Sequence, residues 1–309
     1  MRLKPLLLLC LLLPWMAAWG HRQPPVTIGL CLDHGRGREL LLRLLEKAMD
    51  ENQARLITRD AQDDPAAQVR QAQDLIGRGA QALVVLPCDP ARESALAEQA
   101  RRAGLKVVCL GQPLPSADYL IAFDRRKAGE LQARALLAGH PRGRYLLLGK
   151  DREIRDGWME ALGPAIRKGD VQVAASTRWD PRTGPVDAVL APDAASAQEA
   201  VEALAKSGLR GQVPVSGVGE DLPTCRRVLS GAQQSTVYRP AQKLAEETAY
   251  LSAKLARKAR EFDCAFVEAD NGASKIPAVL LTPRLLGAKD LESAVAGDGL
   301  WEPSDLQGH

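Results

Sequence analysis

The chain has 309 residues, of which 46% are hydrophobic, 26% charged and 4% aromatic. These proportions exclude the disordered, collagenous and disulfide-dense classes, and the length suggests about two domains. The 41 Lys and Arg residues nearly balance the 38 Asp and Glu residues, which leaves a net charge of +3. Because proteins that bind nucleic acid or an anionic membrane present a strong basic field, we expect neither as a partner.

The N-terminus has the pattern of an export signal. Arg2 and Lys4 precede a long apolar run that ends at Ala18-Trp19-Gly20, with small residues at the two positions that a signal peptidase recognises. We therefore expect residues 1–20 to be a signal peptide, cleaved near Gly20, and the mature protein to begin at about His21 in the periplasm. The alternative is an uncleaved anchor, but the run is short for a membrane span of about 20 residues.

After this segment, short β-rich runs alternate with longer segments whose apolar residues recur three and four apart. This alternation predicts an α/β fold of βαβ units with two doubly wound parallel sheets. Strands are expected at Val26–Leu32, Arg55–Thr58, Ala82–Pro87, Lys106–Leu110, Tyr119–Phe123, Arg144–Leu148, Val171–Ala175, Val186–Leu190, Val213–Val218 and Ile276–Leu281. Helices are expected around Leu45 and Ala72 and over Glu93–Ala103, Ala128–Leu137, Ala194–Lys206 and Ala241–Ala259.

The five cysteines after the signal suggest little chemistry. Cys31, Cys88 and Cys109 lie in or at the end of apolar strand-like runs, where cysteine is usually a small buried hydrophobe. Cys225 and Cys264 are the one pair that we consider for a disulfide, which an oxidising compartment would permit.

Signatures of enzymes and of DNA-binding proteins are missing from the sequence. The four histidines have no metal-binding spacing, and no Gly-x-Ser-x-Gly motif is present. Gly143–Lys150 does not fit a phosphate-binding loop, because Asp151 follows the lysine and a strand fills the loop. A gene repressor with this core would need a helix-turn-helix at its N-terminus, and the export signal occupies that place. We therefore expect no catalysis, no cofactor, no metal and no nucleic acid.

Several short segments together carry a family resemblance, and they occur in order along nearly the whole mature chain: Val26–Gly29, Ile76–Gly79, Ala82–Pro87, Ile121–Asp124, Gly129–Ala133, Val215–Gly217, Thr236–Pro240 and Leu280–Pro283. With them the chain resembles the type I periplasmic sugar-binding proteins, most closely their xylose-binding branch. The resemblance implies two lobes joined by a three-segment hinge near Phe123–Arg125, Tyr238–Pro240 and Leu281–Pro283. It also implies a first lobe of residues 21–124 and 240–281 and a second of 125–239 and 282–309.

In such a fold a ligand lies beyond the carboxyl ends of the strands. There carboxylate and guanidinium groups bind pairs of hydroxyl groups, and an aromatic ring packs against the C–H groups of a sugar. The residues expected there are Asp33, Arg36, Gln112, Trp179, Asp193, Glu220 and Arg239. Arg36, in a Gly-Arg-Gly run, favours a polar or anionic ligand. Asp193 has an equally good interpretation as a helix N-cap, and Trp179 is as suited to packing within a lobe as to stacking on a sugar.

The chain departs from the xylose-binding pattern where the sugar would lie. The family's Asp-Arg pair after the fourth strand is replaced by Gly111-Gln112, and its crossing lysine by Arg239. Pro192 and Gly219 replace an Asn and an Asp. We therefore expect a monomeric receptor for a sugar or polyol that serves an ABC permease or a membrane sensor, without tight xylose binding. The alternative is a relative without sugar binding that acts as a sensory or interaction subunit.

The connection Asp180–Pro185 is too short and too rich in proline and glycine for the helix that usually joins parallel strands. One face of the second sheet is therefore expected to expose valine and alanine side chains, near Val173 and Val189, and to contact another protein. The alternative is that neighbouring parts of the lobe cover this face.

Overall fold

The computed structural model describes residues 25–33, 38–179 and 184–307. The expected signal peptide, Arg36 and the first residues of the short connection lie outside this described part. Within it, no helix combines the length and the apolar character that crossing a membrane requires.

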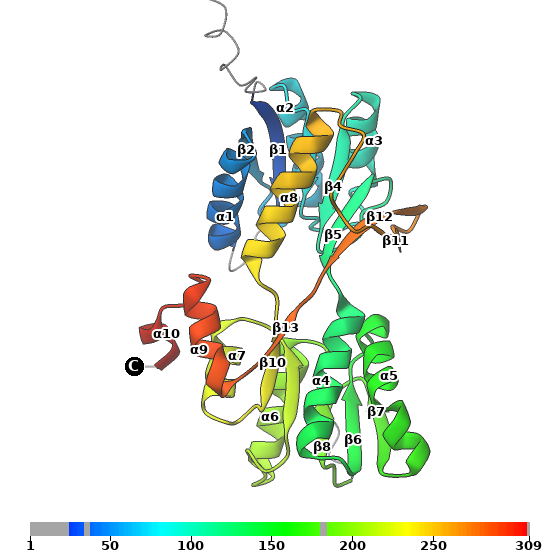
Figure 1. The fold of residues 1–309 in the computed structure, drawn as a ribbon, viewed down its shortest axis with the longest axis vertical. Coiled ribbons are helices and arrows are strands. Elements are labelled where there is room, and N and C mark those ends of the chain that lie inside the picture. Colours follow the sequence, from blue (N-terminus) through cyan, green and yellow to red (C-terminus); the bar gives the residue numbers. More distant parts are fainter. Residues whose placement is uncertain (1–24, 34–37, 180–183, 308–309) are drawn as a thin grey trace, which may run out of the picture.

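The described strands form two sheets, and each sheet with its helices makes one lobe (Figure 1). The first lobe has a seven-stranded sheet in the order β11-β12-β5-β4-β3-β1-β2. Its strands are β1 (Val26–Leu32), β2 (Ala54–Asp60), β3 (Ala82–Val85), β4 (Lys106–Leu110), β5 (Tyr119–Phe123), β11 (Val267–Asp270) and β12 (Lys275–Leu281). Its helices are α1 (Arg38–Glu51), α2 (Pro65–Gly77), α3 (Ser94–Arg102) and α8 (Ala241–Ala256).

The second lobe has a six-stranded sheet in the order β13-β10-β9-β8-β6-β7. Its strands are β6 (Gly143–Leu148), β7 (Val171–Ser176), β8 (Ala188–Leu190), β9 (Val215–Val218), β10 (Ser235–Tyr238) and β13 (Arg284–Gly287). Its helices are α4 (Arg125–Gly139), α5 (Arg152–Lys168), α6 (Ala194–Lys206), α7 (Leu222–Leu229), α9 (Ala288–Gly297) and α10 (Pro303–Gln307).

The expected α/β architecture is confirmed, with one correction at the sheet edges. β11 and β13 run antiparallel to their neighbours, so both sheets are mixed rather than wholly parallel. Each of these strands has only four residues and follows an irregular segment or a proline, and neither shows the apolar pattern of a buried strand. Sequence periodicity therefore did not reveal them.

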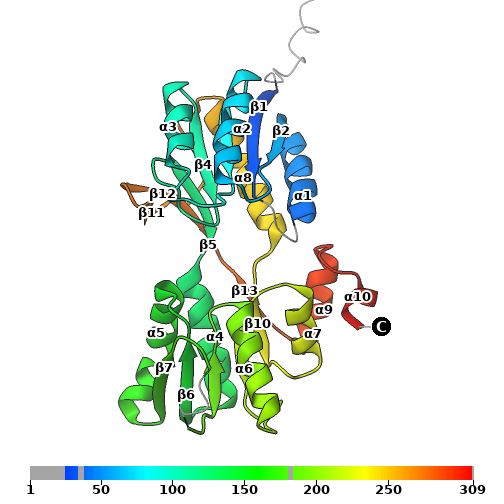
Figure 2. The same ribbon diagram turned by 180° about the vertical axis from the view of Figure 1, so that it is seen from behind.

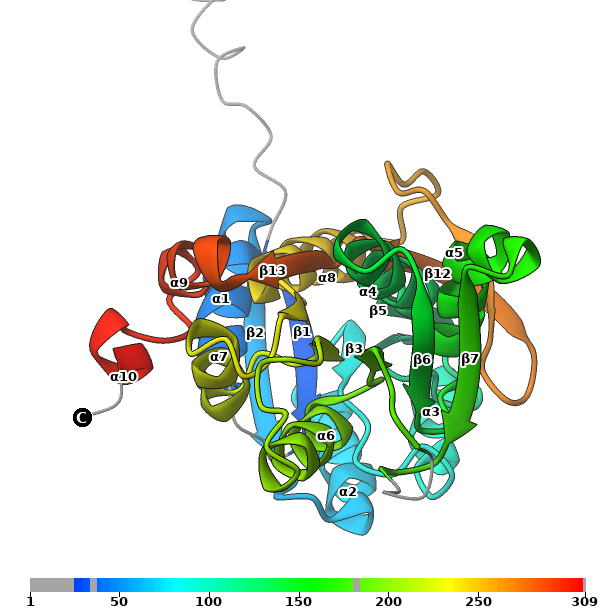
Figure 3. The ribbon, with the colours of Figure 1, turned by 90° about the horizontal axis from the view of Figure 1, so that it is seen from below.

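Helices cover both faces of each sheet (Figures 1 and 2). In the first lobe, α1 and α8 share one core with β1, and the core on the opposite face includes residues of α2 and α3. In the second lobe, α4 and α5 cover one face and α6 the other. Figure 3 shows α9 and α10 at the side of this lobe opposite to β7, where they pack with α7 and β13 in a separate small core.

Helices α4 and α5 approach each other unusually closely, because glycines lie at their contact. A β-carbon on Gly157 would overlap the carbonyl oxygen of Arg126, and one on Gly129 would overlap that of Ile154. Neither position has the positive φ that would by itself require glycine. The close approach of the two backbones therefore requires glycine at both.

We expect Gly157→Ala to lower the free energy of unfolding by about 1–3 kcal/mol, because the added methyl group forces the two helix backbones apart. Gly163→Ala, in the same helix, is the control. Its β-carbon would meet only the mobile end of Arg167, so the substitution should be neutral or stabilise the helix. Urea unfolding of the three proteins measures both effects, and equal stability of the two variants would contradict the packing argument.

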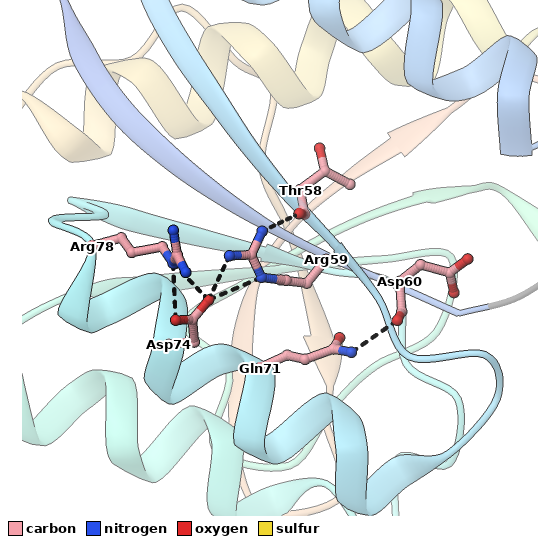
Figure 4. A network of polar contacts seen from close by, with 6 residues as sticks. All are labelled: Thr58, Arg59, Asp60, Gln71, Asp74 and Arg78. Atoms are coloured by element: carbon pink, nitrogen blue, oxygen red, sulfur yellow. Dashed lines mark hydrogen bonds and ion pairs between the residues drawn. The ribbon is translucent and has the colours of Figure 1, made fainter.

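Edge strand β2 is attached to α2 by a group of polar side chains (Figure 4). Arg59 donates from Nε to Asp74 Oδ2 at 2.9 Å, and Arg78, which directly follows α2, donates to the same carboxylate at 2.8 Å. The hydrogen bond from Arg78, followed by that from Arg59, lowers the pKa of Asp74. Gln71 Nε2 donates to the carbonyl of Asp60 at 2.8 Å. These contacts fix the last residues of an edge strand that has only one neighbour.

The expected exposed apolar face of the second sheet is not found, although the crossover helix whose absence led to that expectation is missing from the described residues. The described residues between β7 and β8 contain no helix. Val189 is nevertheless fully buried, in a core shared with α6 and packed on by Trp179. Val173 is 37% exposed, but it pairs with Tyr145 and so lies on the opposite face of the sheet from Val189. The prediction of an apolar contact face was therefore wrong, because a single indole helps to cover the site of the missing helix.

We expect Trp179→Ala to lower the free energy of unfolding by about 2–3 kcal/mol, somewhat less than for a fully buried tryptophan, because it uncovers the core around Val189. Val173→Ala, at an exposed position of β7, should change stability by less than about 0.5 kcal/mol. Thermal and urea unfolding compare the two. A Trp179→Ala protein as stable as the wild type would show that the indole does not serve as a cover.

The disulfide considered for Cys225 and Cys264 is absent. Both cysteines are free, as are Cys31, Cys88 and Cys109. Cys225 is buried in the small core of the second lobe, whereas Cys264 packs against the core of the first. Burial is the main cause that raises the pKa of Cys225 to about 12, so this thiol is unreactive at neutral pH.

Candidate functional site

Three segments cross between the lobes (Figure 1). Asp124 joins β5 to α4, Arg239 and Pro240 join β10 to α8, and Thr282 and Pro283 join β12 to β13. The N–H of Asp124 donates to the carbonyl of Leu281 at 2.9 Å, which ties two of the crossings together. These are the three hinge segments expected from the sequence.

The crossings determine which ends of the sheets face each other. β5 and β12 both leave the first lobe at their carboxyl ends, and β1, β2, β3 and β4 run parallel to them. β10 leaves the second lobe at its carboxyl end, and β6, β7, β8 and β9 run parallel to it. The carboxyl ends of both sheets therefore point toward the other lobe. We call these two ends the facing edges.

On the facing edge of the first lobe, the polar side chains are partly engaged within the lobe. Asp33 follows β1, and its Oδ2 accepts a hydrogen bond from Arg38 Nη2 at 2.6 Å. Its Oδ1 is buried without a partner among the described residues. Gln112 follows β4 with an exposed side chain. Asp33 and Gln112 thus lie at the same edge, where the sequence placed them.

On the facing edge of the second lobe, Glu220 and Arg239 form a two-point ion pair. Arg239 Nη2 lies 2.7 Å from Glu220 Oε1, and Nε lies 3.2 Å from Oε2. Glu220 follows β9 and Arg239 follows β10, two adjacent parallel strands. Trp301 donates its indole N–H to the carbonyl of Glu220 at 2.8 Å and so holds this backbone in place.

Arg125 is a residue of this edge that the sequence analysis did not identify. It begins α4 directly after a crossing, and it forms ion pairs with Asp151 and with Glu153. Burial is the main cause that lowers its pKa, and the positive charge of Arg239 acts in the same direction. The two guanidinium groups therefore lie near each other at this edge. The position of Arg125 at a crossing was a signal that could have revealed it.

Four helices begin at this edge, and an aspartate caps each of them. The carboxylate Oδ1 atoms of Asp124, Asp151, Asp193 and Asp221 accept backbone N–H groups at 2.7–3.0 Å. Such caps stabilise a helix by about 1 kcal/mol. Asp193 is therefore an N-cap, the simpler of its two interpretations, and its exposed carboxylate still lies at the facing edge.

Trp179 is half-buried and packs on the core beside α6, which favours its packing interpretation. An open surface pocket lies elsewhere, at the amino ends of β1 and β2, and is lined by Pro25, Glu46, Asp50, Gln53, Ala54, Arg55 and Leu56. It is remote from the facing edges. In residues 25–33, 38–179 and 184–307, no group of three or more His, Cys, Asp or Glu side chains is arranged to hold a metal ion.

The facing edges offer carboxylates and guanidinium forks, which bind neighbouring hydroxyl groups through charge-assisted hydrogen bonds. The two lobes can approach each other because three narrow segments connect them. This is the arrangement of a hinged binding protein for small polar molecules. The comparison with known families agrees. Residues 36–260 match the model of the periplasmic binding protein domain, and the chain belongs to this family.

Two curated relatives have the same description, D-xylose-binding periplasmic protein. The one from Haemophilus influenzae is 31% identical over 80% of this chain and 81% of its own length. The one from Escherichia coli is 30% identical over 99% of this chain and its entire length.

Solved structures share the fold at lower sequence identity. An ABC transporter solute-binding protein from Clostridium phytofermentans, with bound β-D-glucose, has a TM-score of 0.71 and 17% identity, covering 91% of this chain and 99% of its own. A carbohydrate transporter solute-binding protein from Chloroflexus aurantiacus, in complex with D-glucose, has a TM-score of 0.72 and 18% identity, covering 92% and 98%.

Proposed function

We propose that this protein is an exported receptor that binds a monosaccharide or a similar polyol between its facing edges and presents it to a membrane permease or sensor. The observation that carries the proposal is the pair of opposed facing edges with Glu220, Arg239 and Arg125 on one and Asp33 on the other. The identity with D-xylose-binding periplasmic proteins supports the sugar class. Ligand would stabilise the closed form, which the membrane partner recognises.

The ligand site is proposed to consist of Asp33, Arg36 and Gln112 from the first lobe and Arg125, Asp193, Glu220 and Arg239 from the second. Trp179 belongs to the site only if the face of its indole that is free of the core reaches the ligand. The lobes are proposed to be divided as the crossings divide the chain, at about 124, 239 and 281.

Ion pairing inside each lobe bears on affinity. Asp33, Arg125 and Arg239 already have partners of opposite charge, so a sugar must compete with Arg38, Asp151 and Glu220 for them. Together with Gly111-Gln112 in place of a charged pair, this favours weak binding of xylose. If no sugar binds, the protein is instead a sensory or interaction subunit.

We expect isothermal titration against D-xylose, D-glucose, D-allose and myo-inositol to detect binding of at least one compound, with a dissociation constant for xylose weaker than micromolar. Arg239→Gln should lower the affinity for the compound that binds by about tenfold or more, as loss of one charge-assisted hydrogen bond predicts. Arg134→Gln is the control, because it breaks a comparable ion pair, with Glu130, on an exposed face of α4. No binding by any compound would refute the sugar proposal.

We propose that residues 1–20 direct export and are removed. N-terminal sequencing of the protein from a periplasmic extract should then begin near His21. Changing Gly20 to a bulky residue should leave the longer precursor in the membrane fraction, because signal peptidase requires a small residue there. A mature protein that retains Met1 would contradict the proposal.

A further inference from the structure

Glu93 is a carboxylate buried without a cation. Its residue is fully buried, and it precedes α3 on the facing-edge side of the first lobe. It forms no ion pair with any Lys or Arg in the described part of the chain. One of its oxygens, Oε2, is buried and has no hydrogen-bond partner among the described residues. A buried carboxylate without a cation beside it is costly, so its presence calls for a physical reason.

The other oxygen of Glu93 holds a turn. Oε1 accepts the backbone N–H groups of Cys88 at 3.1 Å and Asp89 at 3.0 Å. These two residues, the Cys88–Asp89 turn, follow β3 at the facing edge, close to the end of β1. Because the helix that Glu93 precedes is fixed by the core, the carboxylate attaches the turn to rigid structure.

Among the described residues, no other acceptor takes the N–H groups of Cys88 and Asp89, although Asp89 itself accepts the N–H groups of Ala91 and Arg92. Pro87 and Pro90 flank the turn and have no N–H, and the N–H of Leu86 donates to Cys31 in β1 at 2.9 Å. The carbonyl of Leu86 accepts from Gln68 Nε2 at 2.8 Å. Every backbone N–H from 86 to 90 is therefore accounted for, and two of the three depend on one carboxylate oxygen.

We propose that Glu93 is a positioning residue that holds the Cys88–Asp89 turn at the facing edge of the first lobe, and that ligand affinity follows its charge. The second clause rests on the proposed function. The ionised carboxylate accepts the two N–H groups through charge-assisted hydrogen bonds, which are roughly twice as strong as neutral ones. Protonation weakens both and loosens the turn that faces the ligand.

The surroundings of Glu93 set the direction of its titration. Burial is the main cause that raises its pKa, opposed by the N–H groups of Asp89 and Cys88 and by the side chain of Cys88. Three titratable groups act on Glu93 or are acted on by it: Cys31 on β1, and Cys88 and Asp89 in the turn. Arg59 on β2 acts on Cys31, and Asp33 and Asp63 act on Cys88. Gln68 Oε1, also buried and without a hydrogen-bond partner among the described residues, is an acceptor and so stabilises no negative charge.

The ionisation of Glu93 affects the global stability of the protein and the rigidity of the Cys88–Asp89 turn in opposite directions. Since the pKa of Glu93 is raised on folding, protonation favours the folded state, and this contribution is lost as pH rises through the folded pKa. The turn behaves in the opposite way, because it is held more tightly when Glu93 is ionised. A residue with only a structural role would change global stability without changing the turn in the opposite direction.

The test uses the ligand-free, ¹⁵N-labelled mature protein. Between about pH 8 and pH 4, the amide signals of Cys88 and Asp89 should shift together with a midpoint above the ordinary glutamate value of about 4.3. In Glu93→Gln this common midpoint should vanish, and both amides should exchange with solvent about tenfold faster while the protein unfolds at an equal or higher urea concentration. Glu98→Gln, on the exposed side of α3, should leave all of these unchanged.

Affinity for D-glucose and D-xylose provides the second measurement. For a sugar that binds, affinity should fall about threefold or more in Glu93→Gln at pH 8 and in the wild type as pH is lowered through the midpoint. An absent or ordinary midpoint in the wild type would overturn the proposal, even if the variant failed to fold. If the raised midpoint is found but affinity does not change, the link between Glu93 and the ligand is wrong. If the wild type binds no sugar, the proposed function is refuted, and the ligand-free titration alone decides whether Glu93 holds the turn.

Discussion

Parallel strand pairing determines where this protein can act. Once the chain leaves the first sheet at the carboxyl ends of β5 and β12, every strand parallel to them ends on the same side, facing the second lobe. β10 imposes the same condition on the second sheet. The loops that carry polar side chains are therefore brought opposite one another, however far apart they lie in sequence.

Helix termini create the electrostatics of this region. In the second lobe, the strands at this edge lead into helices whose N-termini need acceptors for free N–H groups, and aspartates supply them. The carboxylates that collect there are offset by Arg125 and Arg239, which form ion pairs with Asp151 and Glu220. In the proposed site, the groups that cap the helices and form these ion pairs are also the ones that would bind a ligand. Affinity would then depend on how readily they exchange one partner for another.

Two features show how this chain compensates for unusual local sequence. Between β7 and β8, the indole of Trp179 packs where the sheet face has no covering helix. At the end of β3, two prolines restrict the backbone, and a buried glutamate satisfies the two N–H groups between them. In both places one side chain performs a task that secondary structure performs elsewhere. Each also stands near a loop of the facing edges, so packing and ligand binding are not independent.

The sequence by itself determined the class of fold and most strand positions, because these depend on periodicity and on turn residues that are local in the chain. The three crossings came from the family resemblance that its ordered motifs carry. The sequence also placed Asp33, Gln112, Glu220 and Arg239 at strand ends. Only the tertiary structure decided what those residues touch. The pairing of Glu220 with Arg239, the burial of Val189 under Trp179 and the separation of Cys225 from Cys264 depend on contacts between segments distant in sequence, which no local pattern encodes. The antiparallel edge strands β11 and β13 belong to the same class, because their short sequences lack the apolar pattern of a buried strand and they form by pairing with β12 and β10.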